Sequence, residues 1–153
     1  MNAPSVPPPA STAVAPEARA GSFRLYRHVV IGLAIALLAP FTALAWPFAL
    51  LTGAVIGQDN VDRQRGISQS AGVKIVRVLA VTGGVLAMMF FGAIIGGFIA
   101  LPIVGLAAIS ERAAADADPT DRIVARLILI VLPVLAYAAL IATGANVSIR
   151  FGS

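Results

Sequence analysis

The sequence predicts an all-α integral membrane protein with three hydrophobic segments, of which the first two are kinked or hairpin-like. Hydrophobic residues make up 59% of the 153 residues and charged residues only 12%, whereas soluble domains average about 25% charged residues. The uncharged residues gather into three long stretches, at 28–58, 78–110 and 127–149. Each stretch exceeds the roughly 18 apolar residues that mark a membrane segment. Lipid is therefore the expected solvent for most of the chain.

We expect a tail at 1–21 and a membrane domain at 22–153, with segments at about 28–58, 73–110 and 119–146. The tail is dominated by Pro, Ala, Ser and Val and has no hydrophobic periodicity. Because proline lacks a backbone donor and breaks helices, this tail is predicted to be disordered.

The first two stretches are too long for one straight crossing. Their 31 and 33 residues would form helices of about 46 and 50 Å, against a hydrocarbon core of about 30 Å. Helix breakers lie inside both stretches: Pro40, Pro47, Gly96–Gly97, Pro102 and Gly105. Two architectures remain, either kinked single spans or helical hairpins.

The charge distribution favours hairpins. Three single passes would divide the Arg and Lys residues six against five between the two sides, whereas two hairpins gather ten of them on one side. The positive-inside rule therefore supports hairpins. The short half-segments and the backbone of a turn within lipid count against them.

The third segment has a clear start signal. Asp118 followed by Pro119 is typical of an N-cap and first helical residue, and Asp121 suits the helix dipole. Asp118 and Arg122, four residues apart, are expected to pair. The helix is predicted to run from about Pro119 to 144–146, after polar connectors at 58–72 and 110–121.

Small residues supply the positive packing signal. Gly53 and Gly57 form one Gly-x-x-x-Gly motif, and Gly92 and Gly96 form another, with Gly84 expected on the same helical face as the second pair. Bare backbone lets helices approach closely in lipid. These glycines are predicted to be helix-packing residues, either inside the chain or against another subunit.

Basic residues flank the hydrophobic segments, where cations attract lipid head groups. The expected head-group contacts are Arg24, Arg27, Lys74, Arg77, Arg122 and Arg126. His28, at the mouth of the first segment, is expected to be an interfacial histidine and not a haem ligand. The net charge of the whole chain is only +4, and its basic residues flank the apolar stretches, which indicates a membrane surface, not nucleic acid, as the partner.

The residue types exclude several chemistries. Without Cys, the chain has no disulfide, thiolate metal site or cysteine nucleophile. The uncharged stretches hold no Asp, Glu, Lys or Arg for a proton relay, and the acids between 116 and 121 suit a solvated helix start. We therefore expect no enzyme activity, catalytic residue, cofactor or metal.

The expected function is non-catalytic. We predict an accessory or assembly subunit that packs by glycine faces against a larger complex or a second copy of itself. The alternative is a homo-oligomeric pore, holin-like or small channel protein. Ten Arg against one Lys, with abundant Ala and Gly, indicates a bacterial protein. We expect a multi-pass protein of the inner membrane with a cytoplasmic N-terminus.

Overall fold

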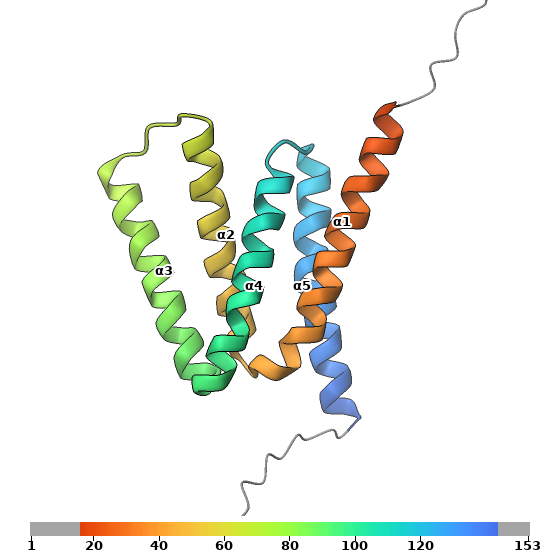
Figure 1. The fold of residues 1–153 in the computed structure, drawn as a ribbon, viewed down its shortest axis with the longest axis vertical. Helices are drawn as coiled ribbons and strands as arrows, with labels where there is room; N and C mark the ends of the chain where they lie inside the picture. The colour runs from red at the N-terminus through yellow and green to blue at the C-terminus, as the bar shows by residue number, and fades with distance from the viewer. Residues whose placement is uncertain (1–15, 144–153) are drawn as a thin grey trace, which may run out of the picture.

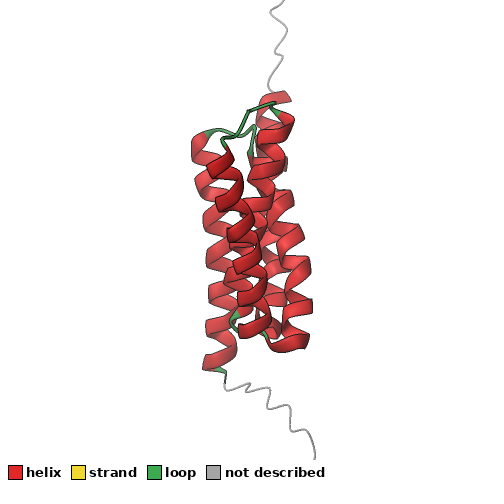
Figure 2. Ribbon diagram, turned by 90° about the vertical axis from the view of Figure 1, so that its left-hand side faces the viewer, coloured by secondary structure: helices red, strands yellow, loops and turns green. Residues whose placement is uncertain are grey.

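The structure is a computed structural model that describes residues 16–143, with side chains from residue 25 onward. Its elements in chain order are α1 (Pro16–Leu38), η1 (Ala39–Thr42), α2 (Ala45–Gln64), α3 (Ala71–Phe91), α4 (Ala93–Ala114) and α5 (Pro119–Ala142). The helices run alternately up and down (Figure 1) and share one long axis (Figure 2). The all-α prediction is confirmed for the described residues.

Four helices (α1, α3, α4 and α5) are each long and apolar enough to cross a membrane. The predicted count of three segments is therefore one too few. The fifth helix, α2, is not among the four, because charged residues begin at Asp59 in its last turns. Its 20 residues still extend about 30 Å, and it lies between α3 and α4 in the bundle (Figure 1).

Both long hydrophobic stretches fold as helical hairpins. The first is α1, η1 and α2, and the second is α3 and α4 joined at Gly92. The start of α1 and the loops at 65–70 and 115–118 lie at one end of the bundle, which we name the polar end (Figure 1). The two hairpin turns lie at the opposite end, which we name the turn end.

The two helices of each hairpin are longer than the uncharged residues alone predicted. The helix α2 continues through charged residues to Gln64, and α3 begins at Ala71, two turns before its uncharged part. The connectors predicted at 58–72 and 110–121 are thus shorter, at 65–70 and 115–118. Several of these charged residues pair with one another at the polar end.

The first hairpin turn follows the predicted breakers. Pro40 lies in η1, and Pro47 lies in the first turn of α2, where a missing backbone donor leaves no hydrogen bond unmade. Between them, Ala43 adopts a φ of 50°, a left-handed conformation that reverses the chain direction.

The second hairpin turn lies earlier than the predicted breakers. The chain reverses at Gly92, followed by Ala93 with a φ of 53°. A Cβ on Gly92 would lie 2.8 Å from the Gly97 nitrogen, so the tight reversal requires glycine. The expected breakers Gly96, Gly97, Pro102 and Gly105 lie inside α4 instead. A proline within a membrane helix is tolerated where its surroundings satisfy the freed backbone group.

The ends of the chain differ in part from expectation. The helix α1 begins at Pro16, so residues 16–21 of the predicted tail are helical, and residues 1–15 lie outside the described residues. The start of α5 at Pro119, with Asp118 in the N-cap position, confirms the predicted start, although the Asp118 side chain makes no capping hydrogen bond. The helix ends at Ala142, and the expected fade at 144–146 lies outside the described residues.

The interior is built largely from small side chains. Ala49 of α2 and Ala100 and Ala107 of α4 are fully or almost fully buried, with Ile35 and Ile103 beside them. Large aliphatic and aromatic side chains instead face outward from α1, α3, α4 and α5. This arrangement suits a lipid solvent, because close helix packing in a bilayer depends on small residues.

Candidate functional site

The Gly-x-x-x-Gly motif of α2 packs against α4. A Cβ on Gly53 would lie 2.5 Å from the Val104 carbonyl oxygen and 2.6 Å from the Ala107 Cβ. A Cβ on Gly57 would lie 2.7 Å from the Cβ of Glu111. No side chain fits at either position unless the helices move apart. These two glycines therefore allow α2 and α4 to approach closely within one chain.

The other three predicted packing glycines also contact the chain itself. A Cβ on Gly84 would overlap the Thr52 hydroxyl of α2, and one on Gly96 would lie 3.6 Å from the Phe41 carbonyl oxygen. A Cβ on Gly92 would meet Ala45 at 2.8 Å. The expected single face of Gly84, Gly92 and Gly96 does not exist, because the chain reverses at Gly92 and places the other two on different helices.

Gly32 is a further close-packed glycine that the sequence did not mark. A Cβ on Gly32 of α1 would lie 2.8 Å from Ile128 and 3.0 Å from Leu132, both on α5. Gly32 belongs to no Gly-x-x-x-Gly motif, so no spacing signal marked it. It lets the first and last described helices pack closely.

Gly83 of α3 has open space beside it. A Cβ there would find no other atom within 4 Å. Spacings of four and three residues put Val76, Ala80 and Ala87 on the same side of the helix, and Val76 and Ala80 are exposed. We name these four residues the α3 stripe. Only 6% of the α3 span is buried, the smallest share among the four spanning helices.

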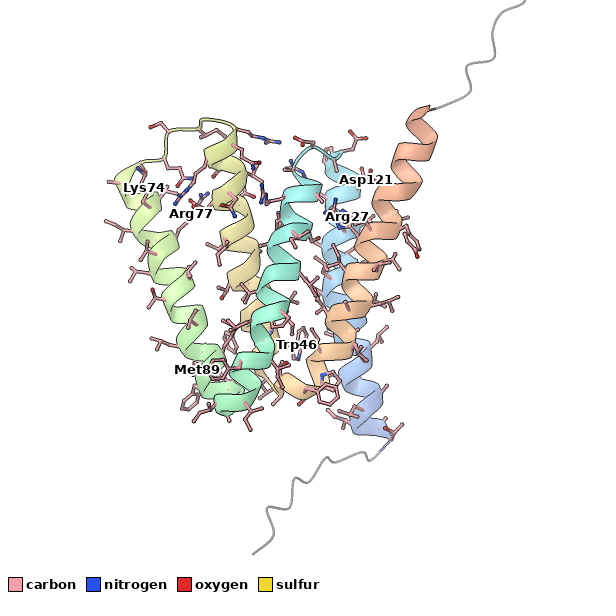
Figure 3. All side chains as sticks on the ribbon, viewed as in Figure 1. Arg27, Trp46, Lys74, Arg77, Met89 and Asp121 are labelled. Atoms are coloured by element: carbon pink, nitrogen blue, oxygen red, sulfur yellow. The ribbon has the colours of Figure 1, made fainter. Side chains whose placement is uncertain are left out.

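The polar end joins α3 to α2 through one arginine. Arg77 of α3 donates to Asp59 at 3.0 Å and to Asp62 at 2.5 Å, both on α2, while Arg63 also pairs with Asp59 at 2.8 Å. The Arg77 side chain is only 20% exposed. Hydrogen bonding from Arg77 lowers the pKa of Asp59, which lies outside the four spanning helices. The labelled Arg77 points from α3 toward α2 (Figure 3).

A second set of contacts joins the two loops and α5 to α4. Arg65 donates to Asp116 at 3.1 Å, and so connects the two polar loops. Arg126 of α5 donates to both carboxylate oxygens of Glu111 on α4, at 3.1 and 3.2 Å. The Arg122 side chain donates to carbonyl oxygens at the end of α4, instead of pairing with Asp118 as expected.

The six predicted lipid contacts have different surroundings. Arg27 and Lys74 are exposed at the polar half of the bundle (Figure 3). Arg77 and Arg122 are occupied by the internal partners just described. The Arg126 side chain is paired yet remains 58% exposed. The side chain of Arg24 lies outside the described part of the structure.

His28 is buried between helices of the bundle. It is 5% exposed, and its Nδ1 lies 3.0 Å from the Ser110 hydroxyl on α4. Ser110 is itself 2% exposed. The sequence did not mark this pair, because the two residues are 82 positions apart. The hydrogen bond satisfies two polar groups that would otherwise be costly to bury.

An apolar groove runs between α2 and α5, with α4 as its floor. Its volume is about 580 Å³. The walls include Leu51 and Ala54 of α2 and Ile130 of α5. The polar end of the groove is lined by Gln58, Glu111 and Arg126, and its inner end by Trp46 and Pro47. Trp46 lies in the lower half of the bundle (Figure 3), 8% exposed.

Two buried polar atoms lack a hydrogen-bond partner among the described residues: the Trp46 indole nitrogen and the Thr52 hydroxyl. Both belong to α2. The same part of the chain contains no group of three or more His, Asp or Glu residues that could hold a metal ion.

The described residues therefore form three features that could serve binding. It has a tightly packed α2–α4 core, an exposed α3 stripe and an apolar groove that ends at an Arg–Glu pair. These features suit contacts with lipid and with other membrane helices. Comparison of the chain with family models, curated proteins and solved structures found no match.

Proposed function

We propose that this multi-pass helical protein is a non-catalytic accessory or assembly subunit that docks against a helix of another membrane protein through the α3 stripe. The observation that carries the proposal is the position of α3 at the edge of the bundle, with 6% of its span buried and open space beside Gly83. A helix from a partner can approach such a bare backbone closely.

The internal glycine contacts support this choice of surface. Gly53, Gly57, Gly84 and Gly92 are already covered by neighbouring helices of the same chain. Gly83 remains open, so it offers a partner the close approach that the other four no longer offer. The contact at Gly84 on the adjacent face of α3 holds the helix to α2 and leaves the stripe outward.

The polarity of α3 supports assembly over conduction. A conduit lined by several copies of a helix needs polar groups along it. Between residues 78 and 91, α3 carries Thr82 as its only polar side chain. An assembly role therefore fits α3 better than the lining of a pore.

We further propose that the polar end faces the cytoplasm of a bacterium, with the protein in the inner membrane. The support is the gathering of Arg and Lys residues toward that end of the described chain, in accord with the positive-inside rule (Figure 3). The turn end carries neutral residues, including Phe41 and Leu44.

Site-specific cross-linking in native membranes tests the assembly role. The chain has no Cys, so single cysteines can carry a short photo-cross-linker. Ala80→Cys lies on the α3 stripe, and Leu135→Cys lies on exposed α5 as the matched control. We expect one discrete adduct with a different membrane protein from position 80 and none from position 135.

A second variant pair tests the same surface by steric filling. Gly83→Leu should abolish the adduct from position 80, whereas Gly105→Leu, at another glycine with open space, should preserve it. An adduct at twice the monomer mass, with ion leak from reconstituted vesicles, would replace the accessory role with a pore. Equal adduct patterns from both cysteines would reject the α3 stripe as the docking surface.

A further inference from the structure

We propose that the groove between α2 and α5 is a binding site for one phospholipid molecule, with an acyl chain along the groove and the phosphate at Arg126. The proposal rests on the groove's length, apolar lining and polar end. It does not depend on the accessory role.

The length of the groove suits one acyl chain. Gln58 at the polar end and Trp46 at the inner end are separated by 12 residues of α2, or about 18 Å. An acyl chain fills half of a hydrocarbon core, which is about 15 Å. A chain whose phosphate lies at Arg126 can therefore extend along the groove nearly to Trp46, close to the turn end.

The lining favours an acyl chain. The side chains along the groove are apolar, and Gln58, Glu111 and Arg126 are confined to its polar end. An apolar lining offers no hydrogen-bond partners, and a methylene chain needs none.

The polar end supplies a phosphate contact. Arg126 uses two N–H groups on Glu111, and a guanidinium has five, so three remain. Its side chain is 58% exposed, whereas that of Glu111 is 12% exposed. A phosphate oxygen at this level can accept charge-assisted hydrogen bonds from the remaining donors. Glu111 fixes the orientation of the guanidinium from the opposite side.

A photoreactive phospholipid tests the position of the acyl chain. The probe is a phosphatidylcholine with a diazirine at the end of one chain, incorporated with the purified protein into phosphatidylethanolamine vesicles. We expect labelling concentrated at 46–51 of α2, the inner end of the groove. Ala54→Phe fills the groove and should lower this labelling to the level of α3. Ala80→Phe, the same change on the α3 stripe, should leave it unchanged.

Leu51→Trp provides a second way to narrow the groove. Leu51 is 66% exposed at the groove wall, so this change does not burden the helix packing. Labelling spread evenly over the outward faces of α3 and α5, or unaltered by both groove variants, would overturn the proposal. Loss of labelling at 46–51 in both variants would support it.

The phosphate contact has its own test. Arg126→Gln should weaken retention of phosphatidylcholine in detergent by about tenfold, the effect of one charge-assisted hydrogen bond, and leave retention of diacylglycerol unchanged. Arg63→Gln, at an exposed arginine outside the groove, is the control. Equal losses for both lipids would refute a phosphate contact, since diacylglycerol has no phosphate.

Discussion

The substitution Gly53→Ala tests whether the bundle depends on the close approach of α2 and α4. The added Cβ would lie 2.5 Å from the Val104 carbonyl oxygen, whereas ordinary contacts begin at 3.4 Å. The helices must therefore separate by about 0.9 Å, the difference between those distances. A gap of about 0.5–1 Å forfeits a quarter to a half of each dispersion contact.

Gly83→Ala is the matched control, because its Cβ would meet nothing within 4 Å. Both changes gain the same helix propensity, about 1 kcal/mol, so their difference isolates the packing. We expect Gly53→Ala to be less stable than Gly83→Ala by about 1–3 kcal/mol, the usual cost of overpacking. This corresponds to a lower midpoint of unfolding.

Equilibrium unfolding in mixed micelles measures this difference. The chain has one Trp, and Trp46 is buried at the start of α2, so its fluorescence reports separation of that helix. Equal midpoints for the two variants would refute the close contact between α2 and α4. A lower midpoint for Gly83→Ala would refute the open space beside α3.

Three further predictions concern the polar groups and the topology. Arg77→Met should destabilise the bundle by about 1–3 kcal/mol in the same unfolding assay, because two carboxylates lose their shared cation. The control Lys74→Met, at an exposed lysine, should change stability by less than about 0.5 kcal/mol. Equal effects of the two variants would contradict the ion pairs. Ser110→Ala should cost about 1 kcal/mol, because the buried histidine ring loses its partner; an unchanged midpoint would show that the hydrogen bond is absent. In sealed vesicles, Arg65→Cys and Phe41→Cys should react with an impermeant thiol reagent from opposite sides, because they lie at opposite ends of the bundle; reaction from the same side would exclude the hairpin topology.

The hairpins were predictable from the lengths of the uncharged stretches and from the charge distribution. The uncharged stretches were too long for one crossing, and the distribution of Arg and Lys favoured a return to the same side. The count of three spanning segments was still one too few, since uncharged residues alone made the two halves of each hairpin too short. The helices α2 and α3 continue into charged residues, and the partners of Arg77, Asp59 and Asp62, lie on a different helix.

The glycines show a similar division. Their positions marked close helix contacts, but Gly84 and Gly96 could not be assigned to different helices without the reversal at Gly92. Gly32 belongs to no Gly-x-x-x-Gly motif, and nothing in the sequence distinguishes the open Gly83 from the covered Gly84 beside it. Whether a glycine is covered or open depends on which helix lies beside it.

The sequence by itself indicated the membrane setting, the helical class and the start of the last helix at Pro119, because these follow from the solvent that apolar residues prefer and from local backbone chemistry. Only the tertiary structure decided the burial of His28 against Ser110 and the groove between α2 and α5. Both involve α4 and helices that are distant from it in the sequence. A local pattern of residues does not show which distant helix faces will pack together.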